Sequence, residues 1–169
     1  MAHALGAKQA NGRFPTIFFI SAPCPQSWIY LQGFCYKFSF QSLTWNASKT
    51  ACKNMESTLA KVDSQEKQIA IAAQLKSREY WIGLYRDPEH TSRWLWIDSS
   101  RLCRGCGYWR KGEPNNMDKD EGCSVMKSWY SGFWNDQSCS QKVRYICQKR
   151  GWYDSFVDQS IIVINFLSE

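Results

Sequence analysis

Long apolar runs and paired histidines are both missing from the sequence. The apolar stretches at residues 14–20 and 161–167 are far shorter than the ~20 residues that cross a bilayer, so we expect no membrane span in this chain. The only histidines, His3 and His90, are far apart and form no ligand-like pair. The net charge is +6, but Lys and Arg are spread along the chain without the long basic tract typical of nucleic-acid binding. No nucleic-acid partner is therefore expected.

Cysteine, in contrast, is abundant, with eight residues in the chain. Only Cys103 and Cys106 have the Cys-x-x-Cys spacing of a zinc knuckle, and no further Cys or His pair stands beside them to complete four ligands. An even number of cysteines without zinc spacing is typical of a disulfide framework formed in an oxidising compartment. We therefore expect a secreted or extracellular protein.

The chain length of 169 residues suits one globular domain, which we place at residues 24–149, followed by a C-terminal tail at residues 150–169. Residues 1–23 loosely resemble a signal peptide, with a basic polar start, a short apolar run and Ala22 at the cleavage edge. The apolar run is short and contains Pro15, which makes the resemblance imperfect. An incomplete or mis-started N-terminus is the equal alternative.

A hairpin and a helix are predicted at the start of the domain. Aromatic and β-branched runs on both sides of Gly33 are typical of two paired strands. Residues 44–55 follow, with Thr44 as a capping residue and Trp45 on the apolar face. This pattern predicts a short amphipathic helix.

A second helix is expected over residues 63–76. Asp63 and Glu66, three residues apart, resemble a capping box. The apolar stripe of this helix would be formed by Ile69, Ala72 or Ala73, and Leu75 or Lys76.

Short strands and one long loop are predicted in the second half of the domain. Strand patterns occur in "YWIGL", "RWLWID", "FWND" and "VRYICQK". Residues 99–132 are rich in Gly, Pro, Asn, Asp and Ser and are expected to form a loop. A loop of this length is unusual unless it is functional or held by ligands and crosslinks.

The ordered motifs "WIGL", "W.W.D", "EPN" and "WND", with two closing cysteines, resemble the C-type lectin domain in its long form. The resemblance runs from Cys24 to about Lys149. It implies an α+β fold with two helices, two small antiparallel sheets and a long calcium-binding loop. It also implies three disulfides, which are Cys24–Cys35, Cys52–Cys147 and Cys123–Cys139.

Cys103 and Cys106 lie outside that framework. A local bridge between them is our first interpretation, since Gly105 allows a tight turn. An intermolecular disulfide is the second. A thioredoxin-like redox pair is a weaker third, because no βαβ pattern surrounds the motif.

Oxygen-bearing side chains gather in two segments of the predicted loop region. Calcium binds six to eight hard oxygen ligands at roughly 2.4 Å, and carboxylates and amides both supply them. In the family that the chain resembles, five positions hold the calcium that touches sugar, and here they are Glu113, Asn115, Glu121, Asn135 and Asp136. The resemblance further implies a cis peptide before Pro114 and a backbone carbonyl ligand from Asp136.

The order of these residues bears on which sugar is bound. Family members with "EPN" resemble binders of mannose, fucose, glucose and N-acetylglucosamine, whereas those with "QPD" favour galactose. Glu113 with Asn115, and Glu121 with Asn135, would each saturate one hydroxyl of a vicinal pair. Met117 either packs on the sugar ring or is an exposed loop residue.

An accessory calcium site is only partly represented. Asp87 and Asn116 match accessory ligand positions and Glu89 is displaced by two residues. Thr91 and Gly122 stand where acidic residues are expected. The sequence therefore favours a single calcium ion.

Several other side chains leave alternatives open. Trp81, Trp94, Trp96 and Trp134 are expected in the core, whereas Trp129 and Tyr130 either stack on an extended glycan or pack against the loop. The basic residues beside the predicted site either contact anionic glycans or form a solvated face, and these are Arg101, Arg104, Arg110 and Lys111. Asn46 begins a glycosylation sequon.

The leading hypothesis is a calcium-dependent carbohydrate-binding module with mannose-type preference, acting in innate recognition or cell adhesion on glycans or glycoproteins. Oligomerisation would supply avidity. The first alternative is a protein-binding lectin-like domain in which calcium is only structural. An enzyme is not expected, because no nucleophile is paired with a base.

Overall fold

The computed structural model describes residues 24–151. The predicted signal peptide at residues 1–23 and most of the predicted tail lie outside the described residues. The last strand, β8 (Arg144–Arg150), continues past the predicted domain boundary at residue 149, and the Gly151 amide donates to the Gly33 carbonyl at 3.1 Å. Within the described range, no helix has the length and apolar character that crossing a bilayer requires.

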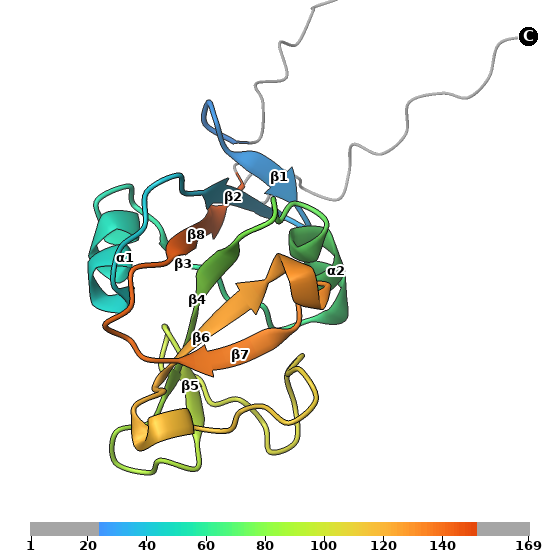
Figure 1. Ribbon diagram of the computed structural model, residues 1–169. Helices are drawn as coiled ribbons and strands as arrows, with labels where there is room; N and C mark the ends of the chain where they lie inside the picture. The colour runs from blue at the N-terminus through green and yellow to red at the C-terminus, as the bar shows by residue number, and fades with distance from the viewer. Residues whose placement is uncertain (1–23, 152–169) are drawn as a thin grey trace, which may run out of the picture.

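One eight-stranded sheet forms the centre of the domain, with six strands in the order β1-β2-β8-β4-β6-β7 (Figure 1). In addition, β3 pairs with β8 and β5 pairs with β4. The strands before β8 are β1 (Ile29–Leu31), β2 (Phe34–Phe38), β3 (Thr58–Leu59), β4 (Glu79–Arg86), β5 (Trp94–Trp96), β6 (Cys123–Lys127) and β7 (Trp134–Gln137). The two separate antiparallel sheets that we expected are joined, because Tyr80 and Trp81 of β4 pair in parallel with Arg144 and Tyr145 of β8.

Helix α1 (Trp45–Lys53) confirms the first predicted helix. The Thr44 side chain accepts a hydrogen bond from the Ala47 amide at 3.3 Å, which satisfies one of the unpaired amides of the first turn. Trp45 and Cys52 are buried on the inner face of this helix.

Helix α2 (Gln65–Ala72) is shorter than predicted and has a different cap. Ser64, not Asp63, accepts from the Lys67 amide, while Asp63 pairs with the Lys67 ammonium at 2.6 Å. The predicted apolar stripe is wrong at Ile69, which is 61% exposed, but Ala72 and Leu75 pack against the core as predicted. Gln68 and Ile71 are the buried residues of this helix.

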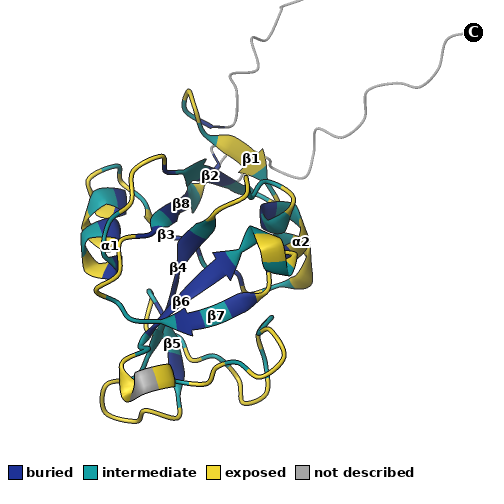
Figure 2. Ribbon diagram, in the orientation of Figure 1, coloured by how far each residue is buried: buried dark blue, intermediate teal, exposed yellow. Residues whose placement is uncertain are grey.

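The core is rich in aromatic side chains, and the strands β4, β6 and β8 contain its longest runs of buried residues (Figure 2). The four tryptophans predicted to lie in the core, Trp81, Trp94, Trp96 and Trp134, are all buried. Trp96 and Trp134 pack edge to face at 5.7 Å, a favourable geometry for aromatic pairs. These contacts anchor β5 against β7, the strand that carries Asn135 and Asp136.

The described residues contain four disulfides, in the pairings expected from the sequence. They are Cys24–Cys35, Cys52–Cys147, Cys103–Cys106 and Cys123–Cys139. Cys52–Cys147 spans 95 residues and ties α1 to β8. Cys103–Cys106 spans three residues, which corresponds to the local bridge of the three alternatives.

The predicted loop over residues 99–132 is interrupted by regular structure. Strand β6 begins at Cys123, and a 3-10 turn, η2 (Ser128–Tyr130), follows it. The loop proper therefore ends before β6 and contains a second turn, η1 (Met117–Lys119), at one end of the molecule (Figure 1).

Candidate functional site

Four of the five expected calcium ligands line one hollow of about 550 Å³ between the long loop and β7. They are Glu113, Asn115, Glu121 and Asn135, and Met117 lies at the same hollow. Residues distant in sequence meet here because β7 pairs with β6, which directly follows the loop. The loop and the strand thus supply two walls of one polar depression.

Asp136, the fifth expected ligand, lies beneath this hollow. Strand β7 alternates between buried and half-buried positions, so the Asp136 side chain faces the interior while Asn135 faces the hollow. The Asp136 carboxylate accepts from the Asn115 amide at 3.0 Å and from the Asn116 amide at 2.9 Å. Its backbone carbonyl accepts from the Asn135 side chain. Asp136 therefore holds the "EPN" segment against β7.

Glu113 is oriented by the turn that precedes it. Its amide donates to the Arg110 carbonyl at 2.9 Å, and the peptide between Glu113 and Pro114 is cis, as the resemblance implied. Burial raises the pKa of Glu113, and the negative charges of Asp136 and Glu121 raise this pKa further. The carboxyl groups of Asp136 and Glu121 therefore lie near enough to disfavour the charged form of Glu113.

The turn η1 orders the remaining donors. The Met117 amide donates to the Asn115 side-chain oxygen at 2.8 Å and to the Glu121 carboxylate at 2.7 Å. Asn116 adopts a left-handed backbone conformation with a φ of 50°, which asparagine tolerates better than most residues. Met117 itself is 62% exposed, so its side chain is free to meet a ligand.

The donor set fits a hard cation. No cluster of three or more His, Cys, Asp or Glu side chains that could hold a metal is present among residues 24–151. The expected set instead combines two glutamates and two asparagines around the hollow, with a buried aspartate below. Calcium accepts such mixtures of carboxylate and amide oxygens. A cation here would also offset the carboxylate repulsion that contributes to the raised pKa of Glu113.

Arg86, which the sequence did not single out, connects three segments beneath the hollow. Its guanidinium donates to the Asp136 carboxylate at 2.7 Å, to the Thr91 carbonyl at 2.9 Å and to the Glu121 carbonyl at 3.1 Å. It also lies 4.6 Å from the centre of the Trp94 ring. No local sequence pattern indicates this role, because the carboxylate partner Asp136 lies 50 residues away.

Two of the three expected accessory calcium residues, Asp87 and Asn116, use their side chains for hydrogen bonds within the protein. The Asp87 carboxylate accepts from the amides of Glu89 at 2.9 Å and His90 at 3.3 Å, which closes a turn. The Asn116 side chain accepts from the Glu121 amide at 3.2 Å. Arg86 bonds to both loops, at Thr91 and at Glu121, so a fixed positive charge lies between the segments that carry these residues.

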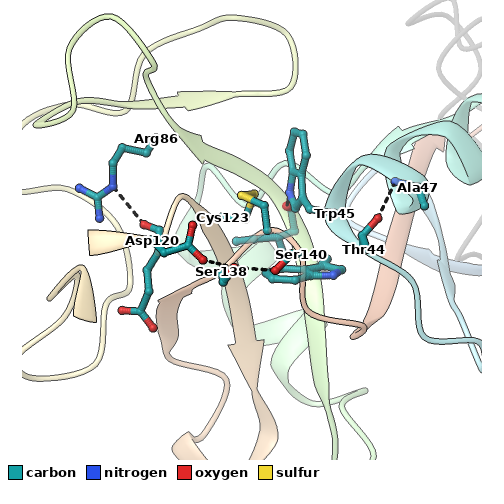
Figure 3. Close-up of a disulfide and its surroundings, with 12 residues drawn as sticks. Thr44, Trp45, Ala47, Arg86, Asp120, Cys123, Ser138 and Ser140 are labelled. Atoms are coloured by element: carbon teal, nitrogen blue, oxygen red, sulfur yellow. Dashed lines mark hydrogen bonds between the residues drawn. A yellow bond between two sulfur atoms is a disulfide. The ribbon is translucent and has the colours of Figure 1, made fainter. Parts of the chain in front are cut away.

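The Cys123–Cys139 disulfide ties the start of β6 to the segment that follows β7 (Figure 3). Arg86 and Asp120 lie on one side of it, and Thr44 and Ala47 of the α1 terminus lie on the other. The Ser138 hydroxyl donates to the Asp120 carboxylate at 2.6 Å, which links the loop to the segment after β7. The covalent and hydrogen-bonded links together fix the separation of the two walls.

The two aromatic residues of η2 point to different surfaces. Tyr130 lines the same hollow as the expected ligands, and the Arg110 guanidinium lies 3.9 Å from the centre of its ring. Trp129 is 56% exposed and lines a separate depression. Asn46, the sequon residue, is exposed in the first turn of α1, whereas Ser48 is buried.

Comparison with known proteins shows the same domain. The Lectin C-type domain profile matches residues 41–149. The chain is 35% identical over 130 residues to the hepatic lectin of Gallus gallus and 40% identical over 128 residues to the CD209 antigen-like protein A of Mus musculus. Each match covers 75% of this chain but only 61% and 52% of the respective relative, so the chain spans part of their length.

Solved structures agree with this comparison. The cow C-type carbohydrate-recognition domain of CD23, determined in the presence of GlcNAc2Man3 oligosaccharide, matches with a TM-score of 0.69 and 32% identity. The match covers 76% of this chain and 96% of that one. The chain therefore belongs to the C-type lectin domain family.

Proposed function

We propose that this domain binds glycans through a calcium ion held by Glu113, Asn115, Glu121, Asn135 and Asp136. The observation that carries the proposal is that four of these residues line a single hollow while the fifth lies directly below it. C-type lectins are non-enzymatic carbohydrate-binding proteins, and the clustered carboxylates are explained as ligands without any catalytic role.

Sugar hydroxyl groups match the donors and acceptors of the hollow. When bound, calcium supplies coordination positions for two hydroxyl oxygens. Each hydroxyl has one proton to donate and a further lone pair to accept with. A glutamate carboxylate accepts the proton, and an asparagine NH2 donates to the lone pair. Glu113 with Asn115 forms one such pair, and Glu121 with Asn135 forms the other.

The order of carboxylate and amide supports a preference for mannose, fucose and N-acetylglucosamine. Neighbouring equatorial hydroxyls of these sugars would meet Glu113 and Asn115 on one side and Glu121 and Asn135 on the other. The similarity to a CD23 domain studied with a mannose-containing oligosaccharide is consistent with this preference. Met117, which is exposed at the edge of the hollow, would pack against the apolar face of the ring.

The natural setting that fits this chemistry is extracellular. Domains of this family are extracellular, and four disulfides suit an oxidising compartment. We propose that the domain acts in recognition of glycoproteins, in innate immunity or cell adhesion. Because single sites bind monosaccharides weakly, several copies would be needed for tight attachment.

A glycan array probed in calcium and in EDTA tests the proposal. We expect binding to mannose-, fucose- and N-acetylglucosamine-terminated glycans that EDTA abolishes. Glu113→Gln should weaken this binding strongly, whereas Glu56→Gln, a change on the exposed surface after α1, should leave it unaltered. Calcium-stabilised folding without any EDTA-sensitive glycan binding would instead favour a protein-binding domain in which calcium is structural.

A further inference from the structure

A second and larger hollow, of about 930 Å³, lies beside the proposed calcium site. Glu113 lines both hollows, and Pro114 lines the second one. A ligand that leaves the calcium site past Glu113 would therefore enter this second space. Four arginines line it, and they are Arg86, Arg93, Arg101 and Arg104.

Three of these arginines have no acidic partner within residues 24–151. Arg86 pairs with Asp136, but Arg93, Arg101 and Arg104 form no ion pair in this part of the chain. Glu113, at the border with the calcium site, is the only acidic residue of the lining. Guanidinium groups gathered in one concavity repel each other and create a positive potential, which an anion would neutralise.

The hollow is built on ordered structure. Trp94 is buried and packs on the half-buried Trp109 with ring centres 4.8 Å apart. The Leu102 amide donates to the Trp94 carbonyl at 2.9 Å, and Arg101 pairs with Leu95 in an isolated bridge. These bonds fix the backbone of Arg101 relative to strand β5, which follows Arg93.

The remaining wall is the short segment that the Cys103–Cys106 disulfide closes. Gly105 has a φ of 76°, a left-handed conformation that glycine adopts without strain. The disulfide and this turn hold Arg104 at the rim instead of leaving it in an open loop. They also give the "CRGC" motif, which the lectin framework does not use, a structural purpose.

We propose that this arginine hollow binds a sulfate or carboxylate group carried by the same glycan that occupies the calcium site. Guanidinium groups bind both anions through paired, charge-assisted hydrogen bonds. A glycan fits better than a continuous polyanion such as nucleic acid, because Glu113 would repel a charged backbone that runs along the site. The inference depends on the proposed calcium-dependent glycan binding and specifies which glycans are preferred.

Immobilised glycans with one constant terminal sugar test the proposal. N-acetylglucosamine is presented unmodified, with a 6-sulfate, or with a sulfate on the next sugar, and glucose is compared with glucuronic acid. We expect about tenfold tighter binding of at least one sulfated or carboxylated form over its neutral parent. The advantage should shrink as salt is raised, since the arginines are solvent-accessible.

The double variant Arg101→Gln/Arg104→Gln should lose this advantage and keep the binding of the neutral sugar. Lys49→Gln/Lys53→Gln, on the exposed face of α1, removes the same charge elsewhere and should change neither. Equal affinity for neutral and anionic sugars, or an advantage that survives the arginine changes, would overturn the arginine hollow alone. Absence of EDTA-sensitive binding to every sugar would instead overturn the calcium site.

A duplex DNA of matched charge separates glycan recognition from general attraction to anions. DNA binding as tight as that of the sulfated sugars, unaffected by EDTA and lost in the arginine variant, would show nonspecific polyanion binding and overturn the proposal. We expect the DNA to bind more weakly than the anionic sugars by at least about tenfold.

Discussion

Arg86 and Asp136 form a salt bridge of 2.7 Å in which the aspartate is completely buried. Asp136 directly follows Asn135, and the same carboxylate accepts from the amides of Asn115 and Asn116. The bridge therefore links strand β4, the loop and strand β7 at one point below the proposed calcium site. The Arg86 guanidinium neutralises the buried carboxylate, while Asn135 on the same strand lines the hollow.

Removing this guanidinium should destabilise the whole domain. Arg86→Gln leaves the Asp136 carboxylate buried without its charged partner, which costs roughly 3 to 5 kcal/mol for buried pairs. We expect a corresponding fall in the free energy of unfolding, measured by urea denaturation in EDTA. Arg86→Lys should recover part of the loss, since it restores the charge but not the forked set of hydrogen bonds.

The matched control for this variant is Arg93→Gln. Arg93 has no acidic partner in the described part of the chain, so its replacement should change the unfolding free energy by less than about 0.5 kcal/mol. Equal effects of the two variants would show that the Arg86–Asp136 bridge contributes nothing particular to stability.

Exchanging the carboxylate and the amide of the "EPN" segment should change sugar preference. Glu113→Gln/Asn115→Asp keeps one acid and one amide but reverses their positions, so the group that accepts the hydroxyl proton and the group that donates to the hydroxyl lone pair change places. We expect galactose to gain over mannose by about tenfold, a modest difference in hydrogen bonding. Competition assays with both sugars, at saturating calcium, measure this ratio. Undiminished mannose preference would assign selectivity to other residues.

As the pH is lowered, calcium affinity should begin to fall at a higher pH than the ordinary pKa of glutamate suggests. Burial, Asp136 and Glu121 raise the pKa of Glu113 above its usual 4.5. Protonated Glu113 cannot coordinate calcium, so affinity should decline as pH falls through this raised value. Calcium titrations from neutral to acidic pH measure the decline. A decline that begins only below 4.5 would contradict the raised pKa.

Without calcium, lowering the pH should have a favourable effect, because the stability of the domain then depends on the raised pKa of Glu113. A carboxyl whose pKa is raised by folding stabilises the folded state below its unfolded pKa, and this stabilisation is lost as pH rises through the folded value. The calcium-free domain should therefore gain stability on mild acidification, and Glu113→Gln should remove that part of the gain. Thermal unfolding in EDTA across the same pH range provides the comparison.

Features with local chemical causes were predictable from the sequence. The Thr44 cap of α1, the buried tryptophans and the segments that carry the oxygen donors depend on neighbouring residues and fixed spacing. Strand β6 was missed because Cys123–Lys127 is buried on both faces and has no alternating pattern. The cap of α2 was misassigned because Asp63 and Ser64 are adjacent and are both good capping residues. The local sequence does not show which of the two accepts the hydrogen bond.

Arg86 and Gln68 were missed for another reason. Their partners lie 50 and 66 residues away in the sequence, at Asp136 and Trp134, so no local pattern could indicate them. A charged residue at a strand end and a glutamine in a helix both suggest solvent exposure. Only the tertiary fold provides the buried acceptor and donor that make these positions favourable.

Gln68 should prove to be a main support of strand β7, which carries Asn135 and Asp136. Its side-chain oxygen accepts from the Trp134 indole at 2.9 Å, and its side-chain nitrogen donates to the Gly132 carbonyl at 3.0 Å. Gln68→Leu leaves the Trp134 indole N–H and the Gly132 carbonyl without this partner. The expected loss is about 2 to 4 kcal/mol of unfolding free energy. Because β7 begins at Trp134, calcium affinity should fall as well. Gln65→Leu, on the exposed first turn of the same helix, should change neither the unfolding free energy nor the calcium affinity. Equal losses of unfolding free energy in the two variants, measured by urea denaturation, would show that helix α2 does not support the site through Trp134.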